Sequence, residues 1–144
     1  MRKKICVKQY MTATAHTVNS GLPIKKAKAM MKTYGVRHLP VQFSGHLVGV
    51  ITDRDLSLAE SFDPTNQLMV DDAMTPDPYT VSPDAPIGDV VETMAIRKLG
   101  CAVVQDANQK VIGIFTATDG LRALGDILND TKRKAHPPER QESR

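Results

Sequence analysis

An internal repeat is the feature that most constrains how this chain can fold. The segments GVITDRDL at 49–56 and GIFTATDGL at 113–121 both place a Gly, two apolar residues and a Thr ahead of an Asp that follows three positions after the Thr. The second segment lies 64 positions after the first, and upstream pairs such as Met11-Thr12 with Met74-Thr75 match at an offset of 63. A match at a nearly constant period over this length indicates one structural unit used twice.

Each unit has the pattern of strand, helix, strand, strand and helix. A Pro precedes the first helical pattern in both copies, which suits the first turn of a helix because the N–H that Pro lacks would have no partner there. Apolar residues then recur at steps of three and four, as in an amphipathic helix; they are Ile24, Ala27, Met31 and Tyr34 in the first copy and Ile87, Val90, Val91 and Met94 in the second. Apolar runs at 39–41, 47–51, 102–104 and 111–115 predict strands, and a second helix is expected after each Asp.

Such a unit has too little apolar surface to be stable alone. We therefore expect an α/β (α+β) fold in which two pseudo-symmetric β-α-β-β-α units pack sheet to sheet around one shared core. We place the units at residues 5–60 and 70–128, a linker at 61–69 and a disordered polar tail at 129–144. The one extra residue of the second copy falls at 106–109, a polar stretch that predicts a hairpin turn.

Composition and charge narrow the class of protein. With 41% hydrophobic and 24% charged residues, the 144-residue chain is typical of a soluble globular protein, and no apolar run approaches the roughly 20 residues that span a bilayer. We expect a cytoplasmic protein with Cys6 and Cys101 as reduced thiols. Residues 1–8 carry four basic side chains and residues 130–144 carry five basic and three acidic ones, which leaves the segment between them at a net charge of −3. An acidic body argues against a nucleic-acid groove.

The repeated Thr and Asp have two interpretations. Thr or Asp before a helix is a common N-cap, which accepts hydrogen bonds from the first N–H groups. A cap needs only one such side chain, however, and both copies keep two. The pair also suits a nucleotide, because a carboxylate accepts from ribose hydroxyls and a Thr hydroxyl with helix-start N–H groups holds a phosphate. Gly49 and Gly113 either let a flat ring approach the backbone or mark a bulge.

Other candidate chemistry is weaker. Asp53 and Asp55 form a DxD pair, but Asp53 corresponds to Ala117 in the second copy, so Asp53 is interpreted as a solvated or capping carboxylate. The histidines have no zinc-ligand spacing, and no metal site is expected. The chain lacks a P-loop, GxSxG and HExxH, so we expect no catalytic residues and no catalytic cofactor.

The segments MT, TV, GVRHLPV and GVITDRDL, followed by MTPDPYTV, LGCAVV and GIFTATDGL, resemble a tandem pair of cystathionine β-synthase (CBS) domains, also called a Bateman module, over roughly residues 5–128. The resemblance implies a non-catalytic regulatory module that binds AMP, ADP, ATP or S-adenosylmethionine and signals to a partner protein. It also implies a homodimer that closes through helices, for which we expect Met30, Met31, Met94 and Ala95 at the surface.

The resemblance further implies where a ligand would bind. Asp55 and Asp119 would hold ribose hydroxyls, and Thr52 and Thr116 would hold phosphate or ribose. One cleft would join Thr116 and Asp119 to the first copy, and its mirror would join Thr52 and Asp55 to the second. The implied ligand-binding set is Thr12, Val36, Arg37, His38, Thr52, Arg54, Asp55, Tyr79, Thr80, Leu99, Gly100, Cys101, Thr116, Thr118 and Asp119.

The two clefts differ, because Arg37 and His38 of the first copy correspond to Gly100 and Cys101 of the second. Phosphate binding is therefore expected more at the first cleft, unless Arg54 or Lys98 compensates. His38 itself either contacts ligand or only packs half-buried against the sheet. Two other functions stay open: a dimerising scaffold that binds no ligand, and a nucleic-acid binder that uses the basic ends.

Overall fold

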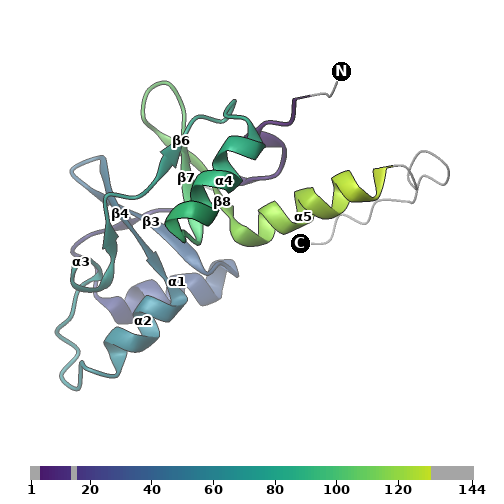
Figure 1. The fold of residues 1–144 in the computed structure, drawn as a ribbon. Coiled ribbons are helices and arrows are strands. Elements are labelled where there is room, and N and C mark those ends of the chain that lie inside the picture. Colours follow the sequence, from purple (N-terminus) through teal and green to yellow (C-terminus); the bar gives the residue numbers. More distant parts are fainter. Residues whose placement is uncertain (1–3, 14–15, 131–144) are drawn as a thin grey trace.

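The structure, a computed structural model, describes residues 4–13 and 16–130. It contains two four-stranded sheets and a set of helices, arranged as Figure 1 shows. The first half contributes the 3-10 helix η1 (Val7–Gln9) and then β1 (Thr12–Ala13), β2 (Val18–Asn19), α1 (Ile24–Tyr34), β3 (His38–Phe43), β4 (His46–Thr52) and α2 (Asp53–Glu60). The second half contributes α3 (Val70–Ala73), β5 (Thr75–Pro76), β6 (Thr80–Val81), α4 (Ile87–Arg97), β7 (Cys101–Gln105), β8 (Val111–Thr116) and α5 (Ala117–Leu128). The predicted helices and strands are confirmed, and the fold is the expected mixed α and β architecture with two pseudo-symmetric motifs.

The two sheets exchange their short first strands. One sheet has the order β2-β3-β4-β5 and the other β1-β8-β7-β6. Strand β1, which begins the first copy, therefore pairs antiparallel with β8 of the second copy, with Thr12 opposite Ile114. Strand β5 does the reverse, with Thr75 opposite Val50 of β4. Each Met-Thr dipeptide thus belongs to the sheet of the other copy.

The exchange explains the two repeated glycines. A Cβ added at Gly49 would lie 2.5 Å from the Met74 sulfur and 2.8 Å from the Thr75 carbonyl oxygen. At Gly113 the corresponding distances are 2.7 Å to the Met11 sulfur and 2.9 Å to the Thr12 carbonyl oxygen. The register of the neighbouring strand shifts beside both glycines, between Val41 and Gln42 and between Val104 and Gln105. The glycines therefore sit at irregular points of the ladder under a methionine, and the room for a flat ring that the sequence suggested is filled by that side chain.

The hydrophobic core consists of two clusters rather than the single shared core that we expected. The first cluster surrounds Leu39, Ile51 and Leu56 and includes Val70 from the second copy. The second surrounds Phe115, Ala102 and Val104 and includes Val7 from the first copy. The core of each motif therefore includes a residue from the other copy.

The helices show which apolar residues stay exposed. Met31 and Met94 are buried in the two clusters, so they are wrong as candidates for a dimer surface. Figure 1 instead shows α5 projecting away from the sheets, and its side chains Leu121, Leu124, Ile127 and Leu128 are 68%, 51%, 48% and 72% exposed. None of the helices in residues 4–13 and 16–130 is long and apolar enough to cross a membrane. Residues 131–144 of the predicted tail lie outside the described part of the chain.

Candidate functional site

The repeated Thr and Asp form a reciprocal cap at the start of a helix in both copies. At α2 the Thr52 hydroxyl accepts from the Asp55 N–H at 3.1 Å, and the Asp55 carboxylate accepts from the Thr52 N–H at 3.0 Å. At α5 the same two bonds join Thr116 and Asp119 at 3.3 Å and 2.8 Å. This is a capping box, in which both side chains are needed. Our argument that a cap would need only one side chain is therefore wrong, and the spacing of the pair is explained without a ligand.

Both capped helices begin at one cavity of about 670 Å³. The cavity lies where the ends of β3 and β4 meet those of β7 and β8, because His38 is opposite Thr52 and Cys101 is opposite Thr116 in the sheets. Strand β1 reaches the same place through its pairing with β8. The lining residues are Thr12, Tyr34, Gly35, Val36, Arg37, His38, Thr52, Asp53, Arg54, Gly100, Ile114, Thr116, Ala117 and Thr118.

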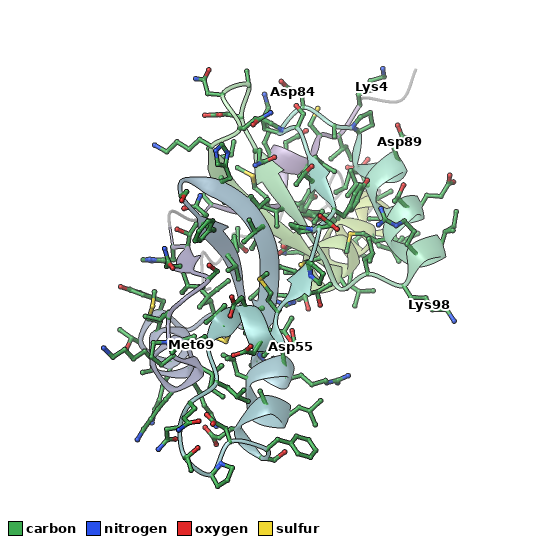
Figure 2. The ribbon with its side chains drawn as sticks, turned by 90° about the vertical axis from the view of Figure 1, so that its left-hand side faces the viewer. Lys4, Asp55, Met69, Asp84, Asp89 and Lys98 are labelled. Carbon is green, nitrogen blue, oxygen red and sulfur yellow. The ribbon has the colours of Figure 1, made fainter. Side chains whose placement is uncertain are left out.

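Most of the residues implied by the family resemblance line this cavity, and they come from both copies. They are Thr12, Val36, Arg37, His38, Thr52, Arg54, Gly100, Thr116 and Thr118. Thr52 and Thr116, which we expected in separate mirror clefts, share one cavity. Asp55 and Asp119 lie one turn into the helices behind the lining, and Figure 2 shows Asp55 near the junction of the two motifs.

Four residues of the predicted mirror cleft are not among the residues that line this cavity. Tyr79 and Leu99 pack against the second hydrophobic cluster, and the Arg97 guanidinium carbon lies 5.5 Å from the centre of the Tyr79 ring. Thr80 lines a second cavity of about 440 Å³ beside the hairpin turns, together with His46 and Asn108. Cys101 is partly buried on β7.

Some lining residues were not in the predicted set. Tyr34 and Gly35 end α1, where Gly35 has φ of +65° and turns the chain toward Val36. Asp53 and Ala117 are the first residues of α2 and α5, and their N–H groups donate to the carbonyls of Arg37 and Gly100 at 3.0 Å. Asp53 is exposed and accepts from the Arg54 N–H at 2.9 Å, as expected for a solvated, locally bonded carboxylate. Asp53 and Ala117 each follow directly after a predicted Thr, and this position would have been enough to predict that they line the site.

The cavity wall holds a mixture of charges. Arg37 and Arg54 are exposed, whereas His38 is half-buried. Burial lowers the pKa of His38, against the carboxylates of Asp53, Asp119 and Asp55, which raise it. Burial also raises the pKa of the Cys101 thiol to about 11, with a smaller contribution from Asp55. His38 and Cys101 are thus neutral near pH 7, and positive charge at the cavity comes from the two arginines.

The two capping carboxylates differ in their remaining oxygen. The Oδ1 atom of Asp119 accepts from the guanidinium of Arg122, and the Asp119 side chain is 4% exposed. Position 58, which corresponds to 122, is Leu58 and is 62% exposed. Across residues 4–13 and 16–130, Asp55 accepts through Oδ2 alone. The two copies therefore have the same capping hydrogen bonds, but they differ in the residue three positions after the Asp, which is Leu58 in the first copy and Arg122 in the second.

Metal ligands do not come together in the described ranges: within residues 4–13 and 16–130, no group of three His, Cys, Asp or Glu side chains is placed to hold an ion. Cys6 and Cys101 are both free.

Comparisons with known proteins agree with this architecture. The CBS domain family model matches residues 7–61 and 70–126. A CBS domain-containing protein of Dictyostelium discoideum is 30% identical over 137 residues, which cover 87% of this chain and 94% of that protein. By contrast, the match to the inosine-5′-monophosphate dehydrogenase of Korarchaeum cryptofilum spans only 21% of that enzyme.

Solved structures of CBS domain pairs have the same fold. The pair of protein MJ0100, in complex with 5′-methylthioadenosine and S-adenosyl-L-methionine, has a TM-score of 0.77 and 27% identity, with 87% of this chain and 99% of that one covered. CBSX2 in complex with AMP has a TM-score of 0.70 and 31% identity, with 85% and 98% covered; this protein is from Arabidopsis thaliana. With two family matches on two motifs that exchange their first strands, the chain belongs to the CBS domain family and carries a tandem CBS pair.

Proposed function

We propose that this chain is a non-catalytic regulatory module that binds an adenosine-containing ligand in the cavity between its two CBS motifs and acts on a partner protein. The observation that carries the proposal is a cavity of about 670 Å³ to which both motifs contribute, a volume within the range of small-molecule sites. Related CBS pairs are known in complex with AMP and with S-adenosyl-L-methionine and 5′-methylthioadenosine.

The lining suits the parts of a nucleotide. Arg37 and Arg54 supply guanidinium groups, and the first turns of α2 and α5 supply the positive ends of two helix dipoles, all of which favour a phosphate. The hydroxyls of Thr12, Thr52 and Thr116 suit ribose or phosphate oxygens. Val36 and Ile114 provide apolar contact for a flat base.

A panel of AMP, ADP, ATP and S-adenosylmethionine in a thermal-shift assay tests the proposal, with GMP as the control for the base. A ligand at about 100 times its Kd stabilises a protein by about 2.7 kcal/mol, which for a chain of this size raises the melting temperature by roughly 5–10 °C. If millimolar concentrations of all four compounds leave the melting temperature unchanged, the ligand-free scaffold replaces this proposal.

The role of the arginines is tested separately. Arg37→Gln removes a charge-assisted hydrogen bond to phosphate, which is typically worth about 1.5–3 kcal/mol. We expect AMP affinity to fall roughly 10- to 100-fold, with the affinity for adenosine nearly unchanged. Lys32→Gln on the exposed side of α1 is the matched control, because it removes a positive charge outside the cavity lining. Equal losses for both variants would mean that only long-range charge matters.

We further propose that the chain forms a homodimer through the outer face of α5. The four exposed apolar side chains of that helix form a continuous stripe at helical spacing, and a closed twofold contact would bury it. This proposal concerns assembly and does not depend on the ligand.

A further inference from the structure

The two Thr–Asp pairs of the repeat are equivalent as caps. In each Asp, however, only one carboxylate oxygen takes part in the cap, and the second oxygen does not. A ribose diol donates hydrogen bonds, so it needs a carboxylate oxygen that is both accessible and not already satisfied. The state of this second oxygen therefore decides which pair can take part in ligand binding.

At the second pair this oxygen is already used. Arg122 lies three residues after Asp119 on α5, on the same face of the helix, and its Nη2 donates to Asp119 Oδ1. The other oxygen, Oδ2, accepts from the N–H of Thr116 at 2.8 Å and from its hydroxyl at 3.1 Å. With 4% of its side chain exposed, Asp119 is satisfied and closed to solvent.

This ion pair will not open readily for a ligand. Arg122 is itself partly buried, with 35% of its side chain exposed. Moving the guanidinium away would leave Asp119 as a buried charge without its cation, which is strongly destabilising. The hydroxyls of a ribose are neutral and do not replace that charge.

At the first pair the corresponding oxygen is open. Position 58 of α2 holds Leu58, which has no group to donate and points largely into solvent. Asp55 is half-buried, and its carboxylate accepts from the N–H of Thr52, which lines the cavity. Oδ1 of Asp55 has no hydrogen-bond partner among residues 4–13 and 16–130.

We infer that the module binds one adenosine ligand per chain, with its ribose on Asp55, and that Arg122 closes the equivalent position at Asp119. The inference rests on the proposed function and adds to it the number of sites and the residue that sets this number. Arg122 is a positioning residue, since it acts through the carboxylate that it holds.

The pseudo-symmetry supplies the test, because each copy contains the residue that the other lacks. AMP binding is measured by isothermal titration calorimetry on the full chain. We expect one AMP per chain for the wild type, two for Arg122→Leu, and at least a 10-fold loss of affinity for Leu58→Arg, which places a guanidinium three residues after Asp55. Leu58→Met keeps an apolar side chain at position 58 and should retain one site with unchanged affinity.

The outcomes separate this inference from the proposed function. No AMP binding by the wild type would overturn both, whereas two AMP molecules per wild-type chain would overturn only the single-site inference. If Arg122→Leu does not fold, as judged by circular dichroism, Leu58→Arg decides alone, because residue 58 is exposed and tolerates a larger side chain. Unchanged AMP binding by a folded Leu58→Arg protein would then show that Asp55 does not hold the ribose.

Discussion

The sulfur of Met74 lies directly over Gly49, so close that a Cβ at position 49 would come within 2.5 Å of it. Met11 lies over Gly113 in the same way. The Met-Thr dipeptide and the Gly of the repeated segment are thus complementary parts of one contact, and the contact always joins one copy to the other. This relationship makes the two motifs depend on each other for their sheets.

We therefore predict that Gly49→Ala and Gly113→Ala are both strongly destabilising. The new methyl group would meet a backbone carbonyl at 2.8 or 2.9 Å as well as the sulfur, and overpacking of this kind typically costs about 1–3 kcal/mol. Chemical denaturation measures the loss. Gly88→Ala in α4 is the control, because nothing lies within 4 Å of its added Cβ; there Ala should stabilise by about 0.5–1 kcal/mol.

The parts of the fold that depend on local pattern were predictable. Helix α1 and strands β3 and β4 follow from the spacing of apolar residues and from Pro23, and all of them formed as expected. The strand exchange and the division of the core into two clusters were not predictable in this way. They depend on Val7 and Val70 packing far from their own copy, and no periodicity within one unit encodes such a contact.

The candidate site shows the same limit. Family resemblance indicated nine of the residues that line the cavity, but it placed Thr52 and Thr116 in different clefts. The capping box could have been found, since Thr-x-x-Asp before an apolar run is close to the usual signature. The ion pair between Arg122 and Asp119 could also have been predicted, because a basic residue three positions after an acidic one on a helix lies beside it. The burial of this ion pair could not have been predicted from the sequence.

Because the cap and the proposed ribose contact use the same carboxylate, we predict that Asp55→Glu separates them. Glu is the preferred residue at this position of a capping box, so the melting temperature without ligand should stay close to that of the wild type. The longer side chain moves the second oxygen away from its native position, so the thermal shift caused by AMP should fall.

Asp55→Ala is the reference for this comparison. It removes the cap as well, and it should lower stability without ligand by about 0.5–2 kcal/mol. A full AMP shift in Asp55→Glu, and also in Asp55→Ala, would mean that the residue only caps α2.

We predict that acid reduces the stabilising contribution of His38. Its pKa is lowered in the folded protein by burial, so the unfolded chain takes up a proton near pH 6.5 while the folded chain does so only at lower pH. The difference in unfolding free energy between the wild type and His38→Gln should therefore shrink as the pH falls below about 6.5 and level off below the folded pKa. Denaturation at several pH values checks this. A difference that grows on acidification would mean that Asp53, Asp55 and Asp119 outweigh burial.

Finally, we predict that Leu124→Glu weakens self-association and leaves the fold intact. Leu124 lies in the middle of the exposed stripe of α5 and is 51% exposed, so a charge there costs nothing in a monomer but would be buried without a partner in a dimer through α5. Sedimentation velocity should show the wild type near twice the chain mass of 15.8 kDa and the variant closer to the monomer.

Phe43→Glu, a charge at an apolar position 58% exposed on β3, is the control and should stay dimeric. If the wild type sediments as a monomer at tens of micromolar (roughly the range in which weak dimers form), the dimer proposal is wrong. If Phe43→Glu dissociates while Leu124→Glu does not, the dimer closes through the sheet hairpin instead of α5.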